Sequence, residues 1–326
     1  MLVLLAACDA KPPDRRPEVD RPTQQIRGMP GVQGANDDVA DSPAQDLVYF
    51  HIRVDVADDI TSDQFAAITS LYLHALPAVE DGGYRAELSA RAGWNVFRIN
   101  SGKRPVTNSA QIIAQAHAWV AIRHEFPGAT IRLRATITHP TGQLAIQEWG
   151  HSNVGAIELP DSGDYTAVTL AVTTLITRFP QLSSLDWTIS AGKQHPADLK
   201  TSRRFPSAQE LQVWNRINAD QSVTHLDKMT INGRVSAPVW VSEESRSHDV
   251  NAALQLAHQH LPIVATLPGP VLYTASDAIQ GHINGDGRAT GPVAITVRGC
   301  TDRDYLLYQP ALAEQALINA YEKCRP

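Results

Sequence analysis

The order of strand-like and helix-like segments between residues 47 and 138 constrains the fold of this chain more than any other feature. Leu47–Val56 alternates apolar and polar residues after Phe50, which is typical of a strand with one buried face. Ala129–Thr138 alternates in the same way. Between them the residues predict a helix, two strands joined around Gly93, and a second helix. The predicted order is therefore strand, helix, strand, strand, helix, strand.

Both helices of this stretch begin at recognisable caps. Thr61 and Gln64 have the spacing of a capping box, in which the two side chains accept hydrogen bonds from free backbone N–H groups at a helix start. Asn108 and Gln111 have the same spacing before the second helix. Apolar residues follow each cap at helical spacing, so we expect both helices to cover one face of a sheet.

A similar order of elements recurs after residue 151. Ser207–Glu210 is another capping box, and Asn232–Gly233 is a dipeptide typical of hairpins. Ile122–Pro127 and Ile176–Pro180 are similar helix ends with a proline stop, although any helix-to-strand corner selects such residues. We therefore predict an α+β chain of two tandem βαββαβ halves, ferredoxin-like or split βαβ sandwiches, over residues 46–150 and 151–326. The second half would contain an inserted helix.

Residues 8–45 differ in composition from the rest of the chain. They hold six prolines, three glycines and many charges, with too few apolar residues to form a periodic face. Such a segment buries too little surface to offset the entropy of ordering. The sequence therefore predicts a disordered, proline-rich tether here.

Charge and hydropathy exclude two classes of protein. The net charge of -6 argues against a nucleic-acid partner, because phosphate binding needs a concentrated excess of Lys and Arg. Beyond Cys8, no apolar run approaches the ~18 residues of a transmembrane helix. With 43% hydrophobic residues, the 326-residue chain can still bury a sizeable core.

The N-terminal residues Leu5-Ala6-Ala7-Cys8 follow a short apolar run and precede a polar, proline-rich segment. They resemble the lipobox of bacterial lipoproteins. The resemblance implies that the Cys8 thiol receives a diacylglycerol and that a signal peptidase cuts just before it. Residues 1–7 would then be the end of a signal peptide; they lack its positively charged start, which we expect upstream of Met1. The resemblance places the protein on the extracytoplasmic face of the bacterial cell membrane, held by its acyl chains.

With Cys8 assigned to the lipid, Cys300 and Cys324 remain as a pair near the C-terminus. Outside the cytoplasm, two leftover thiols in a folded domain usually oxidise to each other. Their spacing does not fit a CxxC redox or metal motif. We therefore predict a disulfide that ties down the last helix.

No local motif indicates catalysis, a cofactor or a metal ion. The chain has no Gly-x-Ser-x-Gly elbow, phosphate-binding loop or dinucleotide-binding loop. His258 and His260 lie two apart on a predicted helix and point about 200° away from each other, so they cannot share an ion from that helix. The adjacent acids Glu243–Glu244 do not resemble an acid/base pair. We therefore expect no catalytic, cofactor-binding or metal-binding residue; the other histidine pairs considered, without a third ligand, are His117 with His124 and His139 with His151.

Exposed aromatic residues are the remaining indication of function. Trp94 and Trp149 flank predicted turns, where they could form an aromatic patch for a partner, although core packing is the commoner role of tryptophan. We predict a membrane-anchored, non-catalytic binding module whose partner is an envelope protein or lipid. One alternative is an envelope hydrolase with a dispersed site, which needs a deep cleft with a His beside a Ser or a carboxylate. The other is a carrier of a lipid or small ligand, which needs a closed apolar cavity.

Overall fold

The structure is a computed structural model. It describes residues 16–42, 47–80, 84–100, 109–135, 154–233, 235–277, 283–284, 286–306 and 308–324. Within these ranges the chain is a mixed α/β protein of seven α-helices and twelve strands. Among the described helices, none combines the length and the apolar character needed to cross a membrane. The chain divides into two compact units, Met1–Val120 and Ala121–Pro326, rather than at the predicted residue 150.

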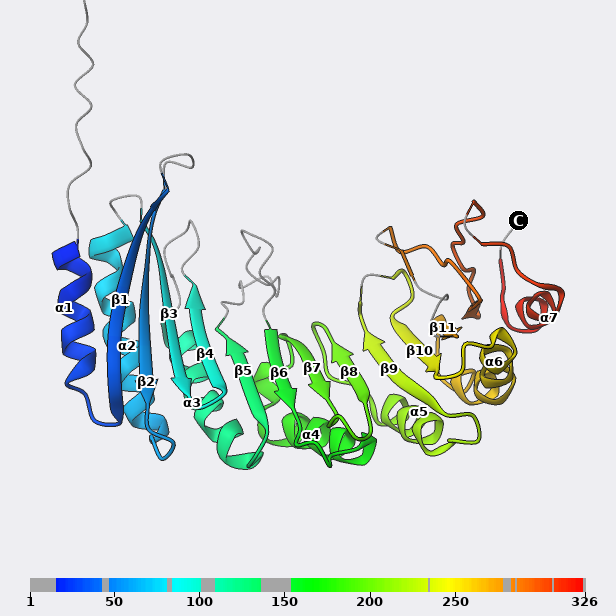
Figure 1. The fold of residues 1–326 in the computed structure, drawn as a ribbon, viewed down its shortest axis with the longest axis horizontal. Helices are drawn as coiled ribbons and strands as arrows, with labels where there is room; N and C mark the ends of the chain where they lie inside the picture. Colours follow the sequence, from blue (N-terminus) through cyan, green and yellow to red (C-terminus); the bar gives the residue numbers. More distant parts are fainter. Residues whose placement is uncertain are drawn as a thin grey trace, which may run out of the picture. The chain divides into compact units, whose positions relative to one another are not determined.

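The first unit contains strands β1 to β4, which pair in the order of the sequence and have helices along one face (Figure 1). β1 and β2 are antiparallel, β2 and β3 are parallel, and β3 and β4 are antiparallel. The chain division falls within α3. The elements in order are α1 (Arg16–Arg27), β1 (Val32–Ser42), β2 (Leu47–Val56), α2 (Ser62–Glu80), β3 (Tyr84–Ala92), β4 (Asn95–Asn100) and α3 (Ser109–Glu125).

The core of the first unit lies between this sheet and its helices. Phe65 on α2, Phe97 on β4 and Trp119 on α3 are buried and stack against one another, with ring centroids 4.8 to 5.9 Å apart. The predicted capping box at the start of α2 is confirmed: Thr61 N–H donates to Gln64 Oε1, and Gln64 N–H donates to Thr61 Oγ1. The aromatic contacts hold α2 and α3 against the sheet, and the capping box fixes the start of α2.

The second unit repeats one supersecondary module. Each module is an antiparallel hairpin followed by a helix, and the first strand of the next hairpin pairs in parallel with the last strand of the one before. The elements are β5 (Thr130–Arg134), β6 (Val154–Glu158), α4 (Tyr165–Arg178), a 3-10 turn (Pro180–Leu182), β7 (Asp186–Ser190), β8 (Ala197–Thr201), α5 (Ala208–Ala219), β9 (His225–Ile231), β10 (Val239–Ser245), α6 (Val250–Val264), β11 (Val271–Ser276), β12 (Val293–Val297) and α7 (Leu312–Tyr321).

The first unit has the same hairpin–helix module, in β1–β2–α2 and in β3–β4–α3. The α+β composition is as predicted, but the tandem ferredoxin-like halves are not confirmed. In a split βαβ arrangement another strand separates the two parallel strands, whereas here β2 and β3 pair directly, as do β6 and β7. The second half was predicted to contain an inserted helix, but each of its described helices follows a hairpin, and α5 is the ordinary connection between the parallel strands β8 and β9.

Residues 16–42, predicted as part of the disordered tether, fold as α1 and β1. Val19, Pro22, Thr23 and Ile26 lie on one buried face of α1. β1 pairs with β2 from Val32 to Ser42. The prediction was wrong over these residues although their composition is polar. The buried face of α1 and the backbone hydrogen bonds between β1 and β2 are enough to give the segment a fixed structure.

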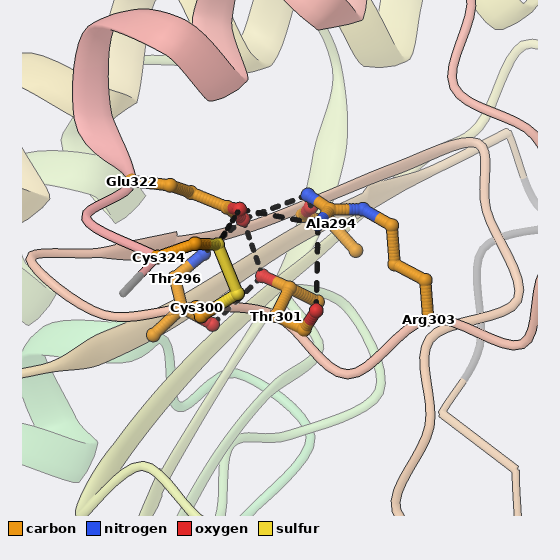
Figure 2. The surroundings of a disulfide bond; sticks show 7 residues. All are labelled: Ala294, Thr296, Cys300, Thr301, Arg303, Glu322 and Cys324. Atoms are coloured by element: carbon orange, nitrogen blue, oxygen red, sulfur yellow. Dashed lines mark hydrogen bonds and ion pairs between the residues drawn. A yellow bond between two sulfur atoms is a disulfide. The ribbon is translucent and has the colours of Figure 1, made fainter. Parts of the chain in front are cut away.

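The C-terminal helix is held to the sheet by the predicted disulfide between Cys300 and Cys324 and by a buried ion pair beside it (Figure 2). Arg303 donates to both carboxylate oxygens of Glu322, at 2.7 and 3.1 Å, and also to the carbonyl of Ala294 on β12. Both charged side chains are only 3% exposed. The bridge and the ion pair therefore fasten the end of α7 to β12 and the loop after it.

Candidate functional site

The structure places only some of the residues predicted to carry function. Cys8, Trp149 and the pair His139 and His151 lie outside the described residues. Trp94 is 85% exposed, as an interaction site requires. The other described tryptophans are buried or half-buried: Trp119, Trp187, Trp214 and Trp240.

Trp94 stands in the turn between β3 and β4. Gly93, the first residue of this two-residue turn, has φ +55°, and nothing lies near the position that a Cβ atom would take. A hairpin turn of this kind favours glycine because the left-handed backbone strains other residues. The turn therefore exposes the indole to solvent at the tip of a hairpin, where it contributes little to the packing of the protein.

The sheet face opposite the helices in the first unit is polar. We call it the open face; its described members are Gly34, Asn36, Asp38 and Ala40 on β1, Tyr49, His51, Arg53 and Asp55 on β2, Glu87, Ser89 and Arg91 on β3, and Val96, Arg98 and Asn100 on β4. Their neighbours along each strand point toward the helices and form the core. An open face bearing arginines, acids and a histidine can form directional hydrogen bonds with a partner.

Glu87 is the centre of the open face. Its carboxylate accepts a hydrogen bond from Tyr49 Oη at 2.6 Å, and it lies 3.6 Å from His51 Nε2 and 4.0 Å from Arg98 Nε. Burial lowers the pKa of His51 although Glu87 opposes the effect. The imidazole is therefore neutral at pH 7, and Arg53, Arg91 and Arg98 carry the positive charge of this surface.

The described histidines that were singled out in the sequence differ in burial: two are exposed, one is half-buried and one is buried. His117 Nδ1 lies 3.9 Å from the fully exposed Asp63, while His124 and His258 are exposed. As predicted, His258 and His260 do not share a site, because they face opposite sides of α6. His260, however, is completely buried.

A buried cluster surrounds His260, and no motif in the sequence indicated it. It consists of His225 and Asp227 on β9, Glu243 on β10, His260 on α6 and Tyr273 on β11, and we call it the histidine–carboxylate cluster. Glu243 and Asp227 are directly opposite each other on the antiparallel strands β9 and β10. Because the pleat turns alternate residues to the same face, all four strand residues point under α6.

The contacts within the cluster are short. Glu243 accepts hydrogen bonds from His260 Nδ1 at 2.8 Å and from Tyr273 Oη at 2.6 Å. His225 Nδ1 donates to the carbonyl of Val223 at 2.6 Å. Its Nε2 lies 3.2 Å from Asp227 Oδ2, without the geometry of a hydrogen bond.

Burial and mutual attraction together set the protonation of the cluster. Burial opposes the charge on His225, but Asp227 and the Val223 carbonyl outweigh it and raise its pKa to about 9. Burial likewise opposes the charge on His260, yet Glu243 raises its pKa. Burial raises the pKa of Glu243, and Asp227 adds to the rise. The negative charge of two neighbouring buried carboxylates is thus compensated by the positive charge of two imidazoles.

An open groove on the second unit lies between α4 and α5. It measures about 730 Å³ and is lined by Tyr165, Thr166, Thr169, Ala208, Leu211, Gln212, Asn215, Arg216 and Ala219. No His, Asp, Glu, Ser or Cys is among these lining residues. The groove therefore does not match the His-bearing cleft of the hydrolase alternative, nor is it the closed cavity of the carrier alternative.

Comparison of the chain with protein-family models, with curated proteins and with solved structures finds no match.

Proposed function

We propose that this protein is a lipoprotein anchored through Cys8 on the extracytoplasmic face of a bacterial cell membrane, where its first unit binds an envelope protein. The observation that carries the proposed binding is the indole of Trp94, which is 85% exposed. Tryptophan is mostly buried in folded proteins and is enriched among the residues that dominate binding energy. Three charged residues of the open face, Glu87, Arg91 and Arg98, lie on the two strands that this turn joins.

The fold of α1 supports a site near the membrane. Only residues 9–15 separate Cys8 from Arg16, the first residue of α1. Eight residue steps span at most about 29 Å when fully extended. A lipid on Cys8 would therefore keep the first unit close to the headgroups, within reach of other membrane-bound proteins.

The disulfide supports the extracytoplasmic location. Cys300 and Cys324 are both exposed to solvent, so a reducing compartment would have access to the bond. Such bonds persist in oxidising compartments and are rare in the cytosol.

The anchor is tested by the mass and the partitioning of the native product. We expect the protein from its native membrane to be heavier than its polypeptide by the mass of a diacylglycerol, with or without a further acyl chain, and to enter the detergent phase. A Cys8→Ser variant should enter the aqueous phase. An unmodified native product that partitions with water would refute the proposed anchor.

Binding is tested by cross-linking and purifying the intact lipoprotein from its native membrane, with quantitative mass spectrometry of proteins and lipids. In a Trp94→Ser variant we expect recovery of the specific protein partner to fall about tenfold or more, because losing a central indole commonly costs 2 kcal/mol or more. Stability should change by less than about 0.5 kcal/mol, since the side chain packs against little.

Leu170→Ser on α4 is the matched control, because Leu170 is also a large, exposed apolar residue, at 67% exposure. It should leave recovery of the partner unchanged. Equal recovery of every protein from the Trp94→Ser and Leu170→Ser variants would contradict a binding role for Trp94. Enrichment of lipids alone would favour the carrier.

A further inference from the structure

We propose that the histidine–carboxylate cluster is a binding site for one divalent transition-metal ion of the zinc type, with His225, Asp227, Glu243 and His260 as ligands. Donor atoms of His225, Glu243 and His260 lie within 4.8 Å of one another. Asp227 lies outside this group as the side chains stand, but its Oδ2 is 3.2 Å from His225 Nε2, so that a shift of its carboxylate toward the ion would supply the fourth ligand. Two imidazoles and two carboxylates are ligands that Zn²⁺ accepts in four-coordinate sites.

Several atoms of this set are buried without hydrogen-bond partners. They are His225 Nε2, both carboxylate oxygens of Asp227 and His260 Nε2. The side chains of His225, Asp227 and His260 are 0%, 1% and 0% exposed. Because buried polar atoms are nearly always satisfied in folded proteins, each such atom requires an explanation. A bound cation would satisfy His225 Nε2 and Asp227 directly.

The surrounding groups match the outer shell of a metal site. A metal-bound histidine usually donates its other ring N–H to a carbonyl or a carboxylate. His225 Nδ1 already donates to the Val223 carbonyl at 2.6 Å, which leaves Nε2 directed at Asp227. His260 Nε2 makes no hydrogen bond as the side chains stand, but Asp220 Oδ2 lies 3.5 Å away, within reach as an acceptor for its N–H when the ring binds the ion through Nδ1. Tyr273 holds the second oxygen of Glu243.

Charge also fits a divalent ion. Asp227 and Glu243 face each other across two strands, and the described surroundings include no Lys or Arg paired with them. Two carboxylates and one dication give a neutral site with neutral imidazoles. The side chain of Asp220 borders His260 and is 38% exposed. An ion from solvent would therefore pass this one side chain to reach the cluster.

A second group of potential ligands, Cys300, Glu322 and Cys324, does not compete in the oxidised protein. Metal binding by cysteine requires the thiolate, and both sulfur atoms are joined in the disulfide. The test must therefore be done without reductant.

The experiment is titration of the oxidised, chelator-treated full chain with Zn²⁺ by calorimetry and with Co²⁺ by visible absorption. We expect one ion per chain and the absorption of four-coordinate Co²⁺. Crystals soaked in Zn²⁺ should show an anomalous peak between His225, Asp227, Glu243 and His260. This measurement needs no variant, so it decides the question even if changes in the cluster impair folding.

Asp227→Asn and His225→Gln are expected to weaken Zn²⁺ binding at least about 100-fold, since changes in the outer shell alone cost 10 to 100-fold. His258→Gln is the matched control: it is exposed on the same helix, two residues from His260, and should bind normally. No stoichiometric binding to the folded wild-type chain, or an anomalous peak elsewhere only, would overturn the proposal.

Discussion

Replacing His260 by leucine is expected to lower the free energy of unfolding of the second unit by about 3 to 5 kcal/mol in metal-free buffer. The imidazole is completely buried and donates to Glu243 at 2.8 Å. Leucine fills a similar volume but leaves Glu243 opposite Asp227 with one positive partner fewer. Removing one partner of a buried ion pair is costly because the remaining charge is desolvated without compensation.

The measurement is urea unfolding of the wild type and the variant in the presence of a chelator. His258→Leu, on the exposed side of the same helix, should change stability by less than about 0.5 kcal/mol. Adding Glu243→Gln to the His260→Leu variant should recover part of the loss, because it removes the uncompensated charge. A loss below about 1 kcal/mol for His260→Leu would show that the cluster is not the tightly coupled unit described above.

Raising the pH from 4.5 to 8 is expected to destabilise the wild-type protein by about 3 kcal/mol through Glu314. This carboxyl on α7 is fully buried; Tyr308 Oη and Ala294 N–H donate to it. Burial raises its pKa to about 7, although the Ala294 N–H and Arg303 oppose the rise. The protonated form is thus favoured in the folded state.

The raised pKa of Glu314 determines that stability falls as the pH rises. A carboxyl whose pKa is higher when folded stabilises the protein fully below its unfolded pKa, 4.5, and this contribution is lost as the pH rises through about 7. Each pH unit of the difference corresponds to about 1.4 kcal/mol. Glutamine at this position does not titrate, so a Glu314→Gln variant lacks this component.

Urea unfolding of both proteins at pH 4.5, 6, 7 and 8 isolates the effect of Glu314. The difference in stability between the wild type and Glu314→Gln should move by about 3 kcal/mol in favour of the variant across this range. Histidines titrate in both proteins, so they cancel in the difference. A difference that stays constant with pH would mean that Glu314 is ionised when folded.

Much of the secondary structure was predictable because its signals are local. Two of the three predicted caps, Thr61–Gln64 and Ser207–Glu210, are present as predicted, and Asn108 of the third lies outside the described residues. α1 had a usable signal too, since residues 19, 22, 23 and 26 have the spacing of one helix face. Its two prolines obscured that signal: Pro17 stands in the first turn, where proline is tolerated, and Pro22 lies inside the helix.

The missed strands depend on neighbours rather than on their own residues. Among residues 32–40 of β1, whose burial is described, only Ala35 is fully buried; the strand is stabilised by its long pairing with β2. β8 is five residues long and polar between its buried positions. The order of the strands within the sheet could not be predicted either. The same order of helices and strands along the chain is compatible with parallel strands that pair directly and with parallel strands that are separated by another strand.

The histidine–carboxylate cluster could not be predicted because its members are distant in sequence. His225 and His260 are brought together by a strand and a helix of the same module, and their rings lie 5.3 Å apart. Glu243 looked like one of two adjacent surface acids. The pleat of β10 separates that pair, burying Glu243 completely and turning Glu244 to the other face. Only the register of β9 and β10 reveals the site.

The hairpin–helix module has a consequence for the evolution of this chain. Within the described part of the second unit, consecutive hairpins pair with each other through β6 and β7, β8 and β9, and β10 and β11. Duplication or loss of a whole module would therefore rejoin equivalent strand edges, and distant modules would keep their own contacts. Relatives of different lengths are expected to differ by whole modules of this kind, while the ends that cap the array stay in place.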